Sequence, residues 1–178
     1  IAANQQSVPI ASALMRSPDE LTQIFRSRGL KMTPQRQTIF RVLHGSAVHP
    51  TAEAVFDSVR REMPTISLRT VYQTLNDLAA MGEIQAIDLG TGSARFDPHT
   101  GPHHHLVCEV CGRVHDVEAE LPGVTAPNAE AFGFTVNTTE IVFRGRCRDC
   151  TAAGYTSRVE DRSASAPAHD PFQEASSA

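Results

Sequence analysis

The chain has 178 residues, of which 40% are hydrophobic and 6% aromatic, with 16 basic and 20 acidic side chains. This length allows one ordinary domain or two small ones and excludes a large multidomain machine. No apolar run approaches the ~20 residues that a membrane span requires, and the composition excludes a collagen-like or coiled-coil rod.

The net charge of −4 argues against nucleic acid as a partner only when it is taken as an average. From Arg16 to Asp97 there are 10 basic and 9 acidic residues, whereas the rest of the chain carries 6 basic and 11 acidic residues. The acidity therefore belongs to the C-terminal half. DNA binding by the first half would depend on local clusters of arginine and on dimerisation, not on bulk charge.

Four short helices are predicted in the first half, because residues that cap or stop helices flank stretches with helical apolar spacing. They are Asp19–Arg28 before Gly29, a helix opened by Thr33 and Pro34, a helix between Thr51 and Pro64, and a helix between Ser67 and Gly82. The spacing then changes to two, and Ile84–Leu89 and Ala94–Phe96 predict a hairpin. Helices followed by a small hairpin are typical of a winged helix-turn-helix, which is assigned to residues 18–97.

The second half is different in kind, and the whole chain is therefore assigned to the α+β class. Its predicted strands are His105–Cys108, Arg113–Val117, Phe134–Val136 and Glu140–Gly145, with a Pro/Gly/Ala-rich segment from Leu121 to Phe132. The assigned segments are a flexible tail at 1–17, a hinge at 98–104, a second domain at 105–152 and a disordered tail at 153–178.

The helix that opens at Ser67 has the pattern of a DNA-reading helix, with an apolar stripe on one face and short polar or donor groups on the other. Taken alone, this pattern also fits an ordinary amphipathic surface helix, but the hairpin that follows favours DNA. The candidate DNA contacts are Arg36, Ser67, Arg69, Thr70, Tyr72 and Gln73.

All four cysteines form two Cys-x-x-Cys pairs, Cys108/Cys111 and Cys147/Cys150, separated by 35 residues. Four thiolates in this pattern predict a closed tetrahedral zinc site with a structural role. Two redox doublets or two disulfides are the alternatives. The doublet spacing of the cysteines, which differs from that of secreted disulfide frameworks, and the lack of an apolar leader at the start favour a cytoplasmic location.

Five of the eight histidines lie at positions 99, 103, 104, 105 and 115. On a strand His103 and His105 face the same side, and Asp97 and Asp116 flank the run, so a second metal site is predicted. His49, before the third helix, would join the two halves through the ion. Such a nitrogen and oxygen set suits Fe²⁺, Mn²⁺, Ni²⁺ or Zn²⁺, and a solvated histidine run or a tag remnant is the alternative.

Six stretches resemble the ferric uptake regulator family of bacterial metal-responsive repressors, in the family's order and spacing. They are Leu30–Arg36, His49–Ala52, Ser67–Tyr72, Ala94–Asp97, His103–Gly112 and Gly145–Cys150. The resemblance implies a homodimer whose winged helices bind palindromic double-stranded DNA. It also implies a C-terminal α/β dimerisation domain that is closed by one structural Zn²⁺ per subunit.

The regulatory positions of the family carry His49, Asp97, His103, His105 and Asp116 here. Iron sensors of the family typically place Glu at the two carboxylate positions, so this set resembles the peroxide-sensing branch. The resemblance then implies one Fe²⁺ or Mn²⁺ per subunit, oxidation of His49 and His103 when iron meets hydrogen peroxide, and release of the operator.

Three alternatives remain: a repressor of the same fold that senses iron, zinc or nickel, a metalloenzyme, and a zinc-storage or metallochaperone module. The enzyme and the storage module leave the Ser67–Leu78 helix unexplained. The sequence therefore predicts a regulator, with no enzyme activity, no membrane contact and no small-molecule substrate apart from peroxide as a signal.

Overall fold

The computed structural model describes residues 14–155 except 47, 91, 120, 125, 127 and 128. The predicted C-terminal tail lies outside the described residues from position 156, as does the predicted N-terminal tail up to position 13. No helix in the described part of the chain is long and apolar enough to cross a membrane.

The first half consists of four helices, and each begins where a side chain caps it. They are α1 (Pro18–Ser27), α2 (Pro34–Leu43), α3 (Ala52–Glu62) and α4 (Leu68–Ala80), preceded by the caps Ser17, Thr33, Thr51 and Ser67. Each cap oxygen accepts a hydrogen bond from a backbone N–H of the first turn, which otherwise has no partner within the helix. The four predicted helices are therefore confirmed.

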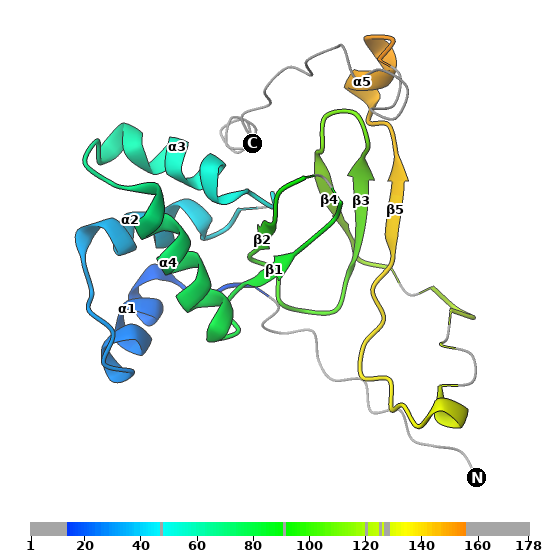
Figure 1. The fold of residues 1–178 in the computed structure, drawn as a ribbon, viewed down its shortest axis with the longest axis horizontal. Helices are drawn as coiled ribbons and strands as arrows, with labels where there is room; N and C mark the ends of the chain where they lie inside the picture. Colours follow the sequence, from blue (N-terminus) through cyan, green and yellow to red (C-terminus); the bar gives the residue numbers. More distant parts are fainter. Residues whose placement is uncertain are drawn as a thin grey trace.

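The helices pack around a common apolar core (Figure 1). Phe25 of α1 meets Phe40 of α2 edge to face, with ring centroids 4.9 Å apart, and both side chains are fully buried. Val71, Leu75 and Leu78 bury one face of α4 in this core, so the opposite face of α4 is left to solvent.

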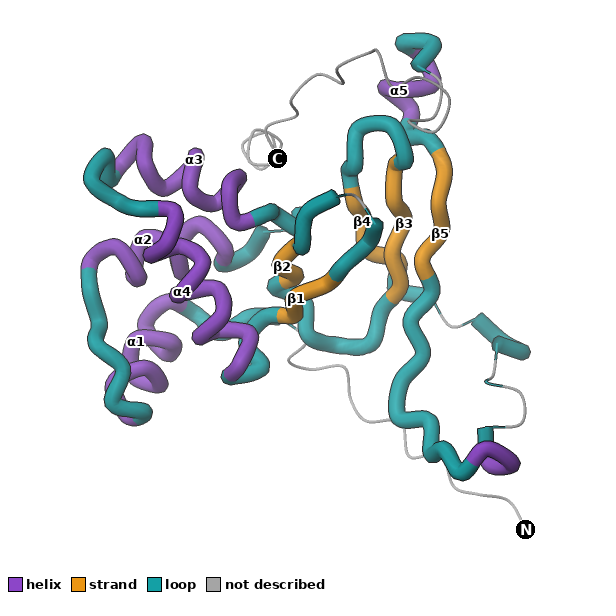
Figure 2. The backbone as a smooth tube through the Cα atoms, viewed as in Figure 1, coloured by secondary structure: helices purple, strands orange, loops and turns teal. Residues whose placement is uncertain are grey.

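The predicted hairpin is confirmed as β1 (Gln85–Ile87) paired antiparallel with β2 (Arg95–Asp97). The second half contains β3 (His104–Cys108), β4 (Val114–Val117) and β5 (Val142–Gly145), in the sheet order β4-β3-β5. β3 runs antiparallel to β4 and parallel to β5, and Figure 2 shows the long loop that precedes β5. The α+β fold class is therefore confirmed.

Two predictions for the second half are wrong. Phe134–Val136 is not a strand, and β5 begins at Val142, not at Glu140. The side chains of Phe134 and Val136 are exposed, and no described strand pairs with them to satisfy their backbone groups. The segment from Leu121 to Phe132 contains only a short 3₁₀ helix, Glu130–Phe132, among its described residues.

The hairpin and the second sheet share a small apolar cluster. It is formed by Ile87 and Leu89 of the hairpin region and by Val107, Val114 and Val142 of the sheet. The Arg144 guanidinium of β5 also donates to the Leu89 carbonyl at 2.8 Å. The hairpin of the first half therefore packs directly against the sheet of the second half.

Candidate metal centres and DNA-reading surface

Five predicted ligands come from separate elements that the fold brings together. His49 lies just before α3, and the Phe96 N–H donates to the Pro50 carbonyl at 2.9 Å, so His49 is held beside the end of β2, where Asp97 lies. His105 on β3 and Asp116 on β4 are partners in the antiparallel register. His103 is in the loop that leads into β3.

The donor atoms of these five residues converge on one small region. His49 Nε2 lies 2.8 Å from Asp116 Oδ1, and His103 Nε2 lies 2.9 Å from Asp97 Oδ2. The Nε2 atoms of His103 and His105 are 3.0 Å apart. The Asp116 side chain is 25% exposed, while the other four are almost completely buried, so Asp116 is the member of the cluster nearest to solvent.

Several buried polar atoms of the cluster lie close to one another but make no well-directed hydrogen bond to any described residue. They are both ring nitrogens of His49, Oδ2 of Asp97 and Oδ1 of Asp116. A buried carboxylate is costly unless a cation or donors compensate it, and three imidazoles with two carboxylates match the preference of divalent transition metals. The residues present therefore fit a divalent metal ion.

The charges of the cluster shift the pKa values of its members in opposite directions. Burial lowers the pKa of His49, but the nearby carboxylates of Asp116 and Asp97 outweigh burial and raise that pKa to about 9. Burial raises the pKa of Asp97, but His105 and His49 outweigh it and hold that pKa far below its usual range. A positive charge between the carboxylates is therefore favoured.

Two of the histidines are held from outside the cluster through their Nδ1 atoms. His105 Nδ1 is 2.9 Å from Oε1 of Glu140, and His103 Nδ1 is 2.8 Å from the Gly101 carbonyl. Both contacts leave Nε2 for the centre of the cluster. Sequence reasoning missed Glu140, because it lies 35 residues from His105 and reaches it only through the parallel pairing of β3 with β5, which begins two residues after Glu140.

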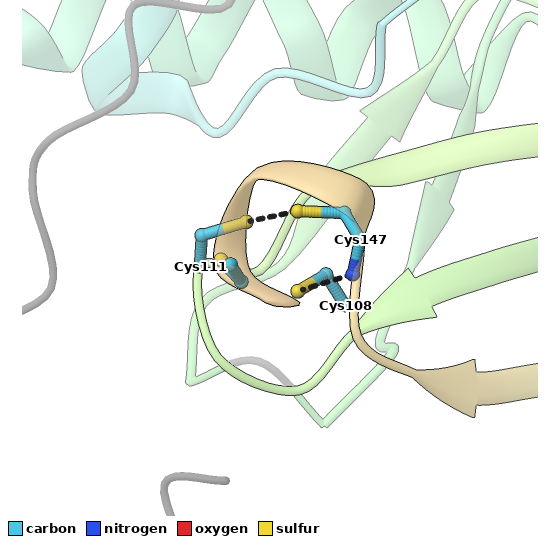
Figure 3. Close-up of side chains that lie close together, drawn as sticks. Cys108, Cys111 and Cys147 are labelled. Carbon is cyan, nitrogen blue, oxygen red and sulfur yellow. Dashed lines mark hydrogen bonds between the residues drawn. The ribbon is translucent and has the colours of Figure 1, made fainter. Parts of the chain in front are cut away.

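The four cysteines meet at the far end of the same sheet. Their sulfur atoms all lie within 4.8 Å of one another, and Figure 3 shows Cys108, Cys111 and Cys147 side by side. Cys111 Sγ and Cys147 Sγ are 3.8 Å apart, far longer than a disulfide bond, and all four cysteines are free. The arrangement is that of a Cys₄ cluster consistent with structural zinc.

The cluster also stabilises a thiolate. Burial raises the pKa of Cys108, but the backbone groups of Cys111, Cys147 and Val110 outweigh burial and lower that pKa to about 6. Burial raises the pKa of Cys111 and Cys150. Helix α5 (Arg148–Ala152), which sequence analysis did not predict, carries Cys150 towards the other sulfurs.

The predicted DNA contacts divide into exposed and internally engaged side chains. Arg69, Tyr72 and Gln73 are exposed on α4, and Tyr72 Oη donates to Glu53 at 2.7 Å. Ser67 Oγ caps α4 by accepting from the Thr70 N–H.

Arg36, by contrast, is only 14% exposed. Its guanidinium pairs with Asp77 at 2.6 Å and lies over the Phe25 ring at 5.1 Å. Its contacts in this structure are therefore with the helical core of the protein.

The fold and the two clusters together define a class: a winged-helix protein joined to a small sheet, with one buried His/Asp cluster whose residues fit a metal ion and one Cys₄ cluster consistent with structural zinc.

Comparison with known proteins narrows this class to a family. The model of the ferric uptake regulator family matches residues 27–144. The peroxide-responsive repressor PerR of Staphylococcus saprophyticus is 33% identical over 133 residues, which cover 74% of this chain and 89% of that protein. The corresponding repressor of Staphylococcus aureus is 32% identical and covers 74% and 90%.

Solved structures of similar fold include a peroxide stress regulator and a ferric uptake regulator. The Campylobacter jejuni peroxide stress regulator superposes with a TM-score of 0.55 at 29% identity, covering 73% of this chain and 98% of that one. The Helicobacter pylori ferric uptake regulator has a TM-score of 0.60 at 20% identity, covering 79% and 97%, and supports the fold alone. The chain belongs to the ferric uptake regulator family, whose members are metal-responsive regulators.

Proposed function

We propose that the chain is a metal-dependent DNA-binding repressor that senses hydrogen peroxide and then releases its operator. The observation that carries this proposal is the ligand set. Aspartates stand at both carboxylate positions of the His/Asp cluster, Asp97 and Asp116, beside three buried histidines. The similarity to peroxide-responsive repressors supports the same assignment.

His49, Asp97, His103, His105 and Asp116 would hold one Fe²⁺ or Mn²⁺ per subunit, and the four cysteines one Zn²⁺. Ferrous iron, when bound, would activate peroxide for cleavage with no net change in its own oxidation state. In the net reaction the imidazole ring supplies both electrons, one peroxide oxygen is added to a ring carbon, and the other oxygen leaves as water with the displaced hydrogen. His49 and His103 are the proposed acceptors of that oxygen. An oxidised ring loses basicity, so its hold on the cluster weakens.

Loss of a ligand would reach the DNA-binding half through the position of His49. This residue lies two positions before Thr51, the cap of α3, and α3 packs against α4 in the helical core. His103, His105 and Asp116 belong to the β3–β4 side. The cluster therefore joins the winged helix, proposed to span residues 18–97, to the sheet domain, proposed to span 105–152, across a hinge at 98–104.

The exposed face of α4 is the proposed reading surface for a palindromic operator. Arg69, Tyr72 and Gln73 stand on it, with Thr70 beside them. Arg36 and Ser67 contribute by holding α4 in place, since Arg36 pairs with Asp77 of α4 and Ser67 caps the helix. The palindrome would match a homodimer.

An exposed apolar surface supports the dimer. Leu106 and Phe143 are register partners on β3 and β5 and lie 49% and 38% exposed. Phe132 and Phe134, before β5, are 75% and 70% exposed. Apolar groups exposed in this way are typical of a protein interface.

Mass spectrometry and DNA binding after peroxide treatment test the proposal. The iron-loaded protein is expected to gain about 16 Da on His49 or His103 and to lose its operator, whereas the manganese-loaded protein keeps its histidines and its DNA. If the iron-loaded dimer retains both operator and unmodified histidines, the chain is a metal-availability sensor, and the peroxide proposal is wrong.

A further inference from the structure

His99 is a buried histidine beside the His/Asp cluster that contributes none of the five converging donor atoms. It is 8% exposed and lies two residues after Asp97, just past the end of β2. Its backbone forms an isolated antiparallel β-bridge with Leu14. Next to this bridge, the Met15 N–H donates a hydrogen bond to the Pro98 carbonyl at 2.8 Å.

This residue touches three of the five expected ligands. Its backbone N–H donates to Asp97 Oδ1 at 2.7 Å, and its ring Nδ1 lies 3.5 Å from Asp116 Oδ2. Its ring stacks on the His103 ring with centroids 4.4 Å apart and planes inclined by 11°.

The contacts with the carboxylates share one pattern. His99 lies against Oδ1 of Asp97 and Oδ2 of Asp116. The opposite oxygens, Asp97 Oδ2 and Asp116 Oδ1, lie 2.9 Å and 2.8 Å from ligand nitrogens without a well-directed hydrogen bond to any described residue. One oxygen of each carboxylate is thereby engaged outside the cluster and the other is left for a metal. The stacked ring restricts rotation of His103, whose Nδ1 the Gly101 carbonyl already holds.

We propose that His99 is a positioning residue of the regulatory site, which holds Asp97, Asp116 and His103 in their ligating orientations without itself binding the metal. This role rests on the proposed function, because it requires that the cluster bind a metal. The ring nitrogen of His99 also lies within 4.8 Å of donor atoms of His103 and Asp116, so direct ligation is the competing role. The contact with the outward oxygen of Asp116 favours positioning.

Two substitutions separate the contacts of His99. His99→Phe keeps a flat ring for stacking on His103 and keeps the backbone N–H, but it removes Nδ1. His99→Asn restores a donor nitrogen near the place of Nδ1 and removes the ring. The matched control is His115→Phe, because His115 is exposed on β4 next to Asp116.

The measurement is Mn²⁺ affinity of the full-length, zinc-loaded protein by chelator competition, with nitrogen ligands counted by X-ray absorption. We expect His99→Phe to weaken Mn²⁺ binding by about 10- to 100-fold, the range found when a residue behind a metal ligand is lost. His99→Asn is expected to recover part of this loss, and His115→Phe to bind as the wild type does. The number of nitrogen ligands and the melting temperature of the Mn²⁺-free protein should stay unchanged in all variants.

Three results would overturn the role. If His99→Phe binds Mn²⁺ as tightly as the wild type, the Nδ1 contact with Asp116 is not needed for metal binding. A loss of one nitrogen ligand in both variants makes His99 a ligand. An equal loss of affinity in both, with a lower melting temperature of the Mn²⁺-free protein, makes it a packing residue. If instead the wild type binds Mn²⁺ no better than a His105→Ala variant, the proposed function itself fails.

Discussion

At the scale of the residue, the short side chain of Asp116 sets how open the His/Asp cluster is. Asp116 is the only one of the five proposed ligands with substantial exposure, 25%, so we expect a small oxidant to approach the cluster on its side. A glutamate at this position would add one methylene group and extend the carboxylate into that space.

Asp116→Glu is therefore expected to abolish the mass increase on His49 and His103 after peroxide while metal-dependent DNA binding persists. The two measurements are mass spectrometry of the iron-loaded variant and operator binding with Mn²⁺. Asp149→Glu, an exposed position that pairs with Arg113 beside the Cys₄ cluster, is a matched control and should oxidise as the wild type does. Oxidation of Asp116→Glu at the wild-type rate would contradict the role given to side-chain length.

Glu140 is a second single residue that is expected to tune the His/Asp cluster, through its contact with the outer nitrogen of His105. Its Oε1 lies 2.9 Å from His105 Nδ1, and the Glu140 side chain is 42% exposed. A carboxylate behind a histidine ligand orients the ring and raises its basicity. Glu140→Ala is expected to weaken Mn²⁺ binding by about 10-fold or more, and Glu140→Gln by less, because the amide oxygen can still accept a hydrogen bond.

Chelator competition measures both affinities, and Glu118→Ala serves as the control because Glu118 is an exposed glutamate just after β4. Equal affinities for Glu140→Ala and Glu118→Ala would show that the contact does not support the site.

At the scale of the element, the sequence predicts what is decided locally. Caps and apolar spacing lie within a few residues of each other, so α1 to α4 could be predicted from residues such as Thr33 and Ser67. The alternation of His103 and His105 likewise predicts that they share a face.

Elements that depend on distant partners could not be predicted in the same way. Phe134–Val136 has strand-like residues but no described strand beside it, and α5 is a five-residue helix whose buried side chain is Cys150. Glu140 reaches His105 only because β5 pairs with β3 in parallel. Pairing between segments that lie this far apart leaves no local pattern in the sequence. The contact between Glu140 and His105 could therefore not be found from the sequence alone.

Two arginines in and beside α4 test which element reads DNA. Arg69 is exposed on α4, whereas Arg36 of α2 is 14% exposed and pairs with Asp77. Arg69→Ala is expected to weaken operator binding by about 1–3 kcal/mol without changing the melting temperature. Arg36→Ala is expected to lower the melting temperature, because it leaves the half-buried Asp77 carboxylate without its guanidinium partner.

Fluorescence anisotropy with operator DNA and thermal unfolding, run on both variants, separate the two effects. Weaker DNA binding with unchanged stability in Arg36→Ala, but not in Arg69→Ala, would reverse the assignment.

At the scale of the whole molecule, one small sheet carries residues of both the His/Asp cluster and the Cys₄ cluster. β3 carries His105 near its start and Cys108 at its end, and its neighbours supply Asp116 on β4 and the approach to Cys147 after β5. The helical half has a separate core of its own, built from residues such as Phe25 and Leu75. The sheet has few buried apolar residues, chiefly Val107, Val114 and the partly buried Val142, so a bound metal would supply much of its stability.

Removal of the Cys₄ centre should therefore unfold the sheet first. In Cys147→Ser, we expect the hydrogen-exchange protection of β3 and β5 to fall while that of α2 and α4 persists, because the helical core does not use the cysteines. The dimer should dissociate in analytical ultracentrifugation, since Leu106 and Phe143 lie on those strands. The affinity for Mn²⁺ should fall as well, although no ligand of the His/Asp cluster is changed.

Thr151→Ser, a conservative change beside Cys150, is the control. If Cys147→Ser stays dimeric and keeps its Mn²⁺ affinity, the sheet is stable without zinc and the two centres are independent.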